Sequence, residues 1–156
     1  MTRLFARSAR GTRAFGRAPR NWGQNVSILG AICLRGTLEP RCVNAATDRH
    51  VFLTYLKEVL VPQLWKGAVV GLDNLGAHKV KGVRELIGAA GARLLYLPPC
   101  SPDLNPIELA WSKLKTHLRA VAARTTEALD AAIAAGWRAV SAQDAQGYFK
   151  HCGLLN

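Results

Sequence analysis

Two acidic residues, Asp73 and Glu108, have the chemistry of a metal-ion site. Asp73 closes the apolar run "AVVGLD", and Glu108 closes the proline-rich stretch "LPPCSPDLNPIE"; the 34 residues 74–107 lie between them. Two carboxylates held close together repel each other unless a cation lies between them. Oxygen ligands with retained waters suit Mg²⁺ or Mn²⁺. The pair therefore predicts a metal site with Asp73 and Glu108 as its ligands.

Each acid also has a structural interpretation. Asp73 can begin a turn with Asn74 and Gly76, and Glu108 can complete a capping box with Asn105, favoured by the helix dipole. Taken singly, each acid fits its structural role. Taken together with the rigid loop and the basic charge described below, the two acids favour the metal site.

The loop before Glu108 holds four prolines, Pro98, Pro99, Pro102 and Pro106. Proline fixes φ and removes a hydrogen-bond donor, so this loop has few conformations. Pro106 suits the first turn of a helix, and Asn105 before it is a natural N-cap. We expect this rigid loop to deliver the Glu108 carboxylate to one place.

A strand–helix–strand unit is predicted from Val69 to Leu97. "GAVVGLDN" and "ARLLYL" are typical of strands covered on both faces, as in a parallel sheet. Residues 79–90 between them place apolar side chains on one helical face, and Gly91 ends that helix. Because ligands gather at the carboxyl ends of parallel strands, Asp73 and Glu108 are expected at one sheet edge.

The other elements follow from turn, cap and periodicity signals. Residues 25–45 predict two strands joined at Arg35-Gly36, and residues 47–65 predict a helix capped by Thr47 or Asp48. A helix from about Pro106 to Val121 carries an apolar stripe, and residues 121–156 predict two shorter helices, opened by Thr125 or Thr126 and by the "SAQD" capping box. Together these elements predict one α/β domain over residues 1–156.

The composition points to an anionic polymer as partner. The chain has 156 residues, a formal net charge of +11, a pI of about 10.2 and four cysteines without C-x-x-C spacing. Nucleic acid is the first expectation for such a charge. The apolar runs are too short to span a membrane, so no membrane partner is predicted, and the cysteine pattern favours a reducing compartment without zinc.

The basic charge is concentrated in residues 1–25. Six arginines and no acid occupy residues 1–20, and we take Arg13, Arg17 and Arg20 as candidate DNA contacts. An arginine-rich start also suits an organellar targeting peptide or a solvated tail. Its glycine and proline content argues against a targeting helix.

The segments "LDNLGAHK" and "GARLLYLPPCSPDLNPIELAWSKLK" resemble the catalytic core of the mariner-like DDE transposases of bacterial insertion sequences. That resemblance implies a ribonuclease-H-like mixed sheet flanked by helices, and three acids (Asp, Asp and Glu) that hold two divalent metals. Asp73 and Glu108 correspond to the second and third acids. The implied chemistry is DNA phosphodiester cleavage followed by strand transfer, with two metals on the attacking and leaving oxygens.

The same resemblance gives neighbouring residues supporting roles. Asn74 and His78 belong to the matched motif and either orient a ligand, touch DNA or form the helix entry. Lys113, Lys115 and Arg119 project away from the apolar stripe of the Glu108 helix, as phosphate contacts or as a solvated helix face.

One part of the family pattern has no counterpart here. The first Asp of the family ends the first, central strand of the sheet, whereas no acid precedes Glu39 in this chain. Asp48 is the nearest aspartate and has the position of a helix cap. We therefore expect the sheet to lack its central strand, which leaves two strand edges unpaired.

Two functions follow as hypotheses. One is a transposase catalytic-domain fragment, inactive alone, whose partners are transposon-end and target DNA and either the missing N-terminal half or a transposase homodimer. The other is a non-catalytic DNA-binding or regulatory remnant. Both place the chain in the bacterial cytoplasm, associated with the nucleoid.

Overall fold

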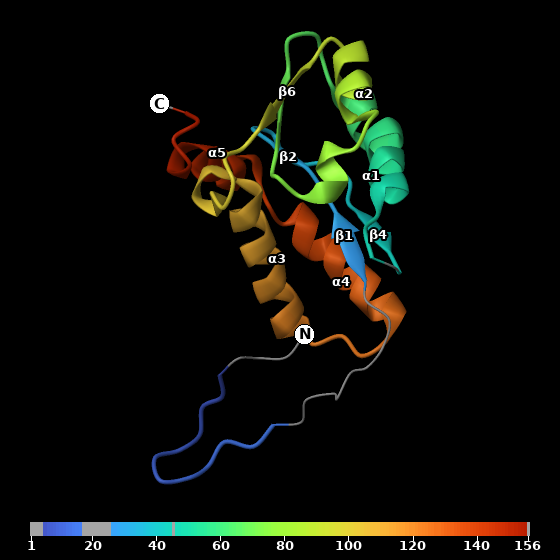
Figure 1. Cartoon of the computed structure of the whole chain (residues 1–156). Coiled ribbons are helices and arrows are strands. Elements are labelled where there is room, and N and C mark those ends of the chain that lie inside the picture. Colours follow the sequence, from blue (N-terminus) through green and yellow to red (C-terminus); the bar gives the residue numbers. More distant parts are fainter. Residues whose placement is uncertain (1–4, 17–25, 45, 156) are drawn as a thin grey trace.

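The computed structural model describes residues 5–16, 26–44 and 46–155. Residues 5–16 are almost wholly exposed and form neither helix nor strand. Figure 1 shows them as a blue loop that extends away from the rest of the molecule. Arg13 lies in this loop, whereas Arg17 and Arg20 fall outside the described residues.

A β-hairpin follows, in the place expected for two strands. β1 (Ser27–Leu29) pairs antiparallel with β4 (Arg41–Val43), and β2 (Ile32–Cys33) pairs with β3 (Gly36–Thr37). Gly36 has a φ of +119°, a backbone conformation that residues other than glycine rarely adopt. The turn itself is formed by Leu34 and Arg35, between the paired residues Cys33 and Gly36, one residue before the predicted Arg35-Gly36.

The next helix changes geometry twice. α1 (Arg49–Tyr55) continues into the π-helical turn η1 (Leu56–Leu60) and the 3₁₀ turn η2 (Val61–Gln63). Pro62 lacks the N–H that a continuing α-helix needs and crowds the preceding turn, which accounts for the break. Asp48 caps α1 by accepting a hydrogen bond from the Val51 N–H at 2.9 Å, so of the two predicted caps Asp48 is the one used.

The predicted βαβ unit is present, with a shorter helix. β5 (Val69–Leu72) runs parallel to β6 (Arg93–Tyr96), and η3 (Gly76–Lys79) and α2 (Val83–Ala89) lie between them. The helix starts only at Val83 because Gly82 has a φ of +104°, in the left-handed region.

The prediction that both strands are covered on both faces is wrong. Val70 is buried on one face, but Val69 and Leu95 on the other are 57% and 54% exposed. Helices α1 and α2 cover one face of the pair, and no described helix covers the other to the same extent.

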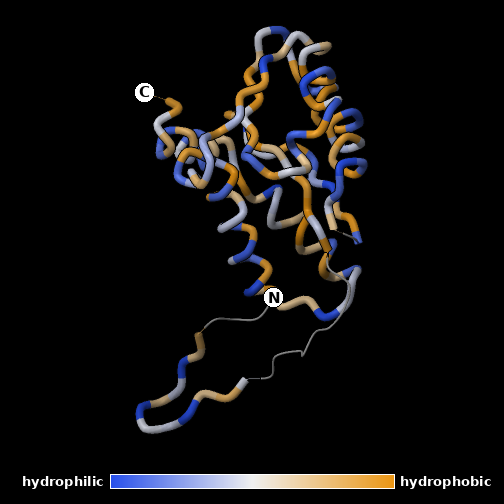
Figure 2. Tube along the Cα trace, viewed as in Figure 1, coloured by the Kyte–Doolittle hydropathy of each residue, from blue (hydrophilic) through white to orange (hydrophobic). Residues whose placement is uncertain are grey.

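Three helices complete the chain after the 3₁₀ turn η4 (Pro102–Leu104): α3 (Ile107–Val121), α4 (Thr126–Arg138) and α5 (Ala142–His151). The Thr125 side chain caps α4, and Ser141 with Asp144 forms the predicted capping box of α5. Figure 2 shows hydrophobic and hydrophilic stretches alternating along these helices, as expected when one side packs inward.

Two hydrophobic clusters hold the molecule together. The first joins α1 and α2 to β5, and the second joins α3 and α4 to the hairpin. Trp137 of α4 is 1% exposed; its indole N–H donates to the Leu38 carbonyl at 2.7 Å, and its ring lies 4.3 Å from that of Trp111. Trp137 thus fixes the helices to the hairpin.

The sheet is divided. The described strands form two antiparallel pairs in the hairpin and one parallel pair, and no described strand joins the hairpin to β5. This division agrees with the expectation of a mixed sheet without its central strand. Within the described part of the chain, no helix is long and apolar enough to span a bilayer.

Candidate active site

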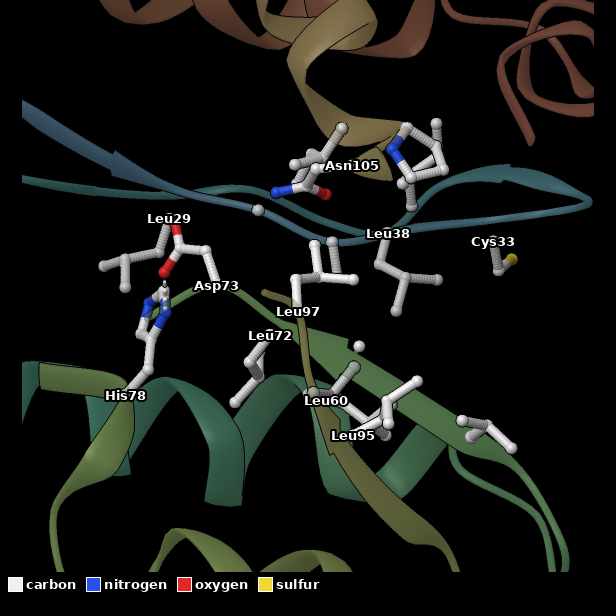
Figure 3. Close-up of a pocket in the computed structure, with 18 of the residues that line it drawn as sticks. Leu29, Cys33, Leu38, Leu60, Leu72, Asp73, His78, Leu95, Leu97 and Asn105 are labelled. Carbon is white, nitrogen blue, oxygen red and sulfur yellow. Dashed lines mark ion pairs between the residues drawn. The ribbon is translucent and has the colours of Figure 1, made fainter. Parts of the chain in front are cut away.

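Asp73 follows directly after β5, at the carboxyl end of the parallel pair. Its Oδ1 accepts a hydrogen bond from the Leu75 N–H at 2.9 Å, which forms the predicted turn. His78 Nδ1 lies 2.6 Å from the same oxygen, as a close ion-pair contact without the angle of a good hydrogen bond. Figure 3 shows the two side chains facing each other. The Asp73 side chain is 48% exposed, and the residue lines the cavity described below.

The turn that carries Asp73 is held on three sides. The Asn74 side-chain amide donates to the Leu97 carbonyl, which ties the end of β5 to the start of the proline loop. The Tyr96 hydroxyl donates to the His78 carbonyl at 2.8 Å, and the His78 ring lies 4.3 Å from the ring of Phe52. Asn74 and His78 therefore fix the turn on which Asp73 stands.

Glu108 lies in the first turn of α3, at the end of the rigid loop. Cys100 within that loop has a φ of +54°, so the chain reverses direction there in a conformation uncommon for a side-chain-bearing residue. Among the described residues, no hydrogen bond or ion pair engages the Glu108 carboxylate. The capping-box interpretation of Glu108 is therefore not what the structure contains.

Asn105 has a different role from the one predicted. Its main-chain carbonyl, rather than its side chain, accepts from the Glu108 N–H at 3.0 Å, and α3 begins at Ile107 with Pro106 as its N-cap residue. The Asn105 side chain is not used as a cap. It lines the same cavity as Asp73 and Glu108.

A cavity of about 270 Å³ brings the acids together. Asp73, Asn74, Asn105 and Glu108 line it, with the proline loop as one wall. No lysine or arginine is among the described residues that line it, so no lysine or arginine in this cavity balances the charge of the two carboxylates. Two carboxylates and an amide are oxygen ligands of the kind that Mg²⁺ and Mn²⁺ prefer.

The described residues supply two acids rather than three. They contain no group of three or more His, Cys, Asp and Glu side chains placed to hold one metal ion. Asp48 is occupied as the cap of α1, and Asp103 does not line the cavity. One or two carboxylates with waters and substrate phosphates are nevertheless a common way to hold magnesium, so the residues present fit the ion.

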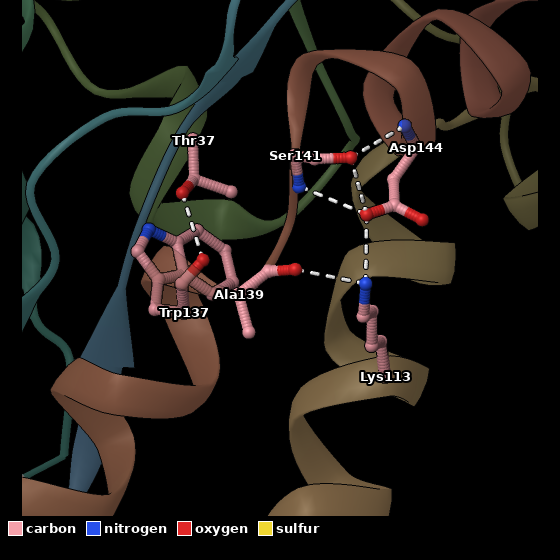
Figure 4. A network of polar contacts seen from close by, with 6 residues as sticks. All are labelled: Thr37, Lys113, Trp137, Ala139, Ser141 and Asp144. Carbon is pink, nitrogen blue, oxygen red and sulfur yellow. Dashed lines mark hydrogen bonds and ion pairs between the residues drawn. The ribbon is translucent and has the colours of Figure 1, made fainter.

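The predicted DNA contacts separate into two groups. Lys115 is exposed and Arg119 partly exposed on α3, and Arg13 is exposed with its guanidinium 6.0 Å from the centre of the Phe15 ring. Lys113 is different, because its Nζ donates to the Ala139 carbonyl at 2.8 Å and to Asp144 Oδ2 at 2.7 Å (Figure 4). Lys113 ties α3 to α5, and we remove it from the candidate DNA contacts.

The sequence did not indicate this Lys113–Asp144 pair or the supports of His78. Lys113 and Asp144 lie on separate helices, and no local pattern links them. In the sequence, Tyr96 is part of the strand segment "ARLLYL" and Phe52 is part of the predicted helix over residues 47–65. A polar hydroxyl at the end of an apolar strand was the single available signal for Tyr96.

Comparison with known proteins gives a consistent result. The family model of the DDE superfamily endonucleases matches residues 1–130. The Tcb2 transposase of Caenorhabditis briggsae is 33% identical over 112 residues, which cover 67% of this chain and 40% of that protein. The Tc1 transposase of Caenorhabditis elegans is 26% identical over 125 residues, or 78% of this chain and 46% of the relative. The chain thus spans less than half the length of these relatives.

A solved structure supports the fold. The crystal structure of the Mos1 mariner paired end complex with Mn superimposes on 96% of this chain and 46% of that chain, with a TM-score of 0.67 and 16% sequence identity. The predicted ribonuclease-H-like fold class is confirmed by this similarity. With 130 of its residues matched by the family model, the chain belongs to the DDE superfamily endonucleases.

Proposed function

We propose that this chain provides the acid pair of a transposase catalytic domain, which cleaves DNA strands and transfers them in a metal-dependent reaction. The observation that carries the proposal is the position of Asp73 and Glu108. They come from separate elements, line one cavity, and have no lysine or arginine beside them there. Homology to the Tcb2 and Tc1 transposases supports the same reaction.

In this proposal Asp73 and Glu108 hold Mg²⁺ or Mn²⁺, with the Asn105 amide as a supporting oxygen ligand. A divalent ion bound there supplies a Lewis acid for a phosphodiester oxygen and lowers the pKa of a bound water. The proline loop and the first turn of α3 fix where the Glu108 carboxylate stands. Such precision matters because small displacements of a catalytic group cost rate.

His78 acts as a positioning residue for Asp73. Its Nδ1 stands 2.6 Å from Asp73 Oδ1, and its side chain is only 17% exposed and lies against Phe52, with the rings tilted by 37°. The packed ring therefore limits the rotation of the Asp73 carboxylate. Mutation of a residue that orients a metal ligand commonly lowers the metal affinity by about 10- to 100-fold.

DNA is the proposed substrate and partner. Arg13, Lys115 and Arg119 are its candidate phosphate contacts, joined by Arg17 and Arg20 outside the described residues. We propose that a third carboxylate comes from a second polypeptide of the transposase assembly, so that the chain alone does not cleave DNA. A nucleoid-associated, cytoplasmic location in a bacterium fits this partner.

A metal-dependent nicking assay tests the proposal. The chain is incubated with supercoiled plasmid and Mg²⁺ or Mn²⁺, alone and extended upstream by a strand that ends in aspartate. Nicking is expected only from the extended form, and Asp73→Ala or Glu108→Ala in that form abolishes it while DNA binding persists. Persistent nicking in either variant contradicts the assignment of the acid pair.

A second function, a DNA-binding or regulatory remnant without catalysis, is favoured by two observations. The described residues supply two acids for the site, and the net charge is +11. This function predicts tight, salt-sensitive DNA binding and no nicking by the extended form.

A further inference from the structure

The first turn of α3 carries Glu108 but has few polar contacts of its own to hold it. Among the described residues, no side chain caps the start of α3, and the Glu108 carboxylate has no partner. The turn is closed by backbone bonds, from the Glu108 N–H to the Asn105 carbonyl at 3.0 Å and from the Leu109 N–H to the Pro106 carbonyl at 3.2 Å. The position of Glu108 therefore depends on how the rest of α3 is held.

Lys113 joins α3 to two other helices about one and a half turns beyond Glu108. Its Nζ donates to the Ala139 carbonyl at the end of α4, at 2.8 Å, and to Asp144 Oδ2 in the first turn of α5, at 2.7 Å (Figure 4). The contact between the two charged side chains is partly buried. One ammonium group therefore holds α3, α4 and α5 together.

Asp144 is itself fixed by the capping box of α5. Its Oδ2 also accepts from the Ser141 N–H and from the Ser141 hydroxyl, each at 2.8 Å. The hydrogen bond from Lys113, and then those from Ser141, lower the pKa of Asp144 to about 2, so this carboxylate is ionised at neutral pH. The hydrogen bond from Lys113 is thus a charge-assisted one, and such bonds are about twice as strong as neutral ones.

The other end of α5 lies near the proline loop. Cys152, at the end of α5, is buried; burial, and then the charge of Asp103, raise the pKa of its thiol. Asp103 belongs to η4, five residues before Glu108, and Lys113 follows Glu108 by five residues. Figure 1 shows α5 alongside this part of the chain. Helix α5 therefore lies against the Glu108 segment on both sides of the acid.

We propose that Lys113 is a positioning residue for Glu108, because its contacts with α4 and α5 fix the rotation of α3 about its own axis. A rotation of about 20° would move the end of a side chain that lies about 6 Å from the helix axis by about 2 Å. Metal ligands tolerate displacements of only about 0.2 Å. The effect on metal binding rests on the proposed function, whereas the hold of Lys113 on the first turn of α3 does not.

Lys113 offers a matched set of variants. Lys113→Met keeps a linear side chain and removes the donors, whereas Lys113→Arg keeps the charge and the donors. Thr125→Ala is the control for stability alone, because it removes the cap of α4, a bond of 3.2 Å from the Ala128 N–H, at the far end of that helix from Ala139. Lys113→Met and Thr125→Ala should each lower the melting temperature by about 2 to 4 °C.

Amide hydrogen exchange, followed by NMR on the full chain without metal, tests the hold on the first turn. Amides at a helix end exchange through local opening, so a loss of global stability alone does not change their rates. Lys113→Met should speed the exchange of the Glu108 and Leu109 amides by about tenfold. Thr125→Ala should leave these rates within about twofold of the parent chain, and Lys113→Arg within about threefold.

Manganese titration tests the effect on the site. Lys113→Met should bind Mn²⁺ about tenfold more weakly than the parent chain, because Glu108 is then less well placed. Thr125→Ala, although equally destabilised, should bind Mn²⁺ like the parent chain. Glu108→Gln, measured in the same titration, tests the proposed metal site separately.

Two results overturn the proposal. One is equal exchange of the Glu108 and Leu109 amides in Lys113→Met and Thr125→Ala, which would mean that Lys113 contributes to folding stability only. The other is parent-like Mn²⁺ affinity in Lys113→Met together with a clear loss in Glu108→Gln, which would mean that Glu108 keeps its place without Lys113. Unchanged affinity in Glu108→Gln would instead overturn the proposed metal site, and the exchange rates would still decide this inference.

Discussion

Some side chains of α3 contact the rest of the protein, and others are exposed and are candidate contacts with DNA. Lys115 is exposed and has no partner among the described residues. Lys113, in contrast, is held by the Ala139 carbonyl at the end of α4 and by Asp144 in the first turn of α5. We expect Lys115→Ala to weaken DNA binding and to reduce the slope of log affinity against log salt by about 0.9, the value of one phosphate contact. Lys113→Met is the matched control, and it leaves that slope unchanged. A reduced slope in Lys113→Met contradicts the division.

Asp144 makes part of the folding stability depend on pH. Its hydrogen bond to Lys113, and then those to Ser141, lower the pKa of this carboxyl from 3.8 to about 2. Because folding lowers this pKa, the contribution is complete above about pH 4 and is lost as the pH falls towards 2. The melting temperature of Asp144→Asn should therefore lie below that of the parent chain at neutral pH and converge with it near pH 2. A constant difference across this range would show that the contact does not depend on ionisation.

The sequence predicted the acid pair but not how the surrounding side chains act. The positions of Asp73 and Glu108 follow from a general rule about the carboxyl ends of strands, and the proline loop is a local feature. The contact between Asp73 and His78 depends on how a short turn closes, and the Lys113–Asp144 pair depends on how two helices pack. No spacing rule in the sequence encodes either contact.

The packing of the hairpin against α4 depends on a glycine. A Cβ on Gly30 would overlap the ring of Trp137, with its Cη2 atom only 2.9 Å away. Because that ring is buried and hydrogen-bonded to Leu38, it has little room to move. Gly30→Ala should lower the free energy of unfolding by about 2 kcal/mol, the usual cost of overpacking, as measured by urea denaturation. Gly71→Ala is the control, since it meets open space, and equal stability of the two variants would be inconsistent with this packing.

Elements with clear terminal signals were predicted well. The hairpin turn lies within one residue of its predicted position, and the Asp48 cap and the capping box at Ser141 lie where local residue types placed them. The later start of α2 and the break before Pro62 were not predicted; the first follows from the left-handed conformation of Gly82 and the second from the proline. The exposed face of β5 was missed for another reason, since an apolar run has the same appearance whether or not its second face is covered.

The whole molecule consists of two hydrophobic clusters on either side of a divided sheet. β5 and β6 with α1 and α2 form one part, and α3 and α4 form the other. The hairpin contributes to both, with Leu29 in the first cluster and Ile28 and Ile32 against the second. A cavity of about 640 Å³ lies between the hairpin and β5, and Asp73 and Glu108 are among the residues that line it. This arrangement agrees with the sequence-based expectation of a sheet without its central strand.

Manganese binding tests the central claim, that Asp73 and Glu108 form one metal site. The chain is titrated with Mn²⁺, and the free ion is followed by electron paramagnetic resonance. Asp73→Asn and Glu108→Gln should each lose at least about tenfold in affinity, and His78→Ala about tenfold through the freed carboxylate. Asp103→Asn, a carboxylate of the same loop that does not line the cavity, should bind Mn²⁺ like the parent chain. Unchanged Mn²⁺ affinity in Glu108→Gln would contradict the account, because the Glu108 carboxylate would then not be a metal ligand.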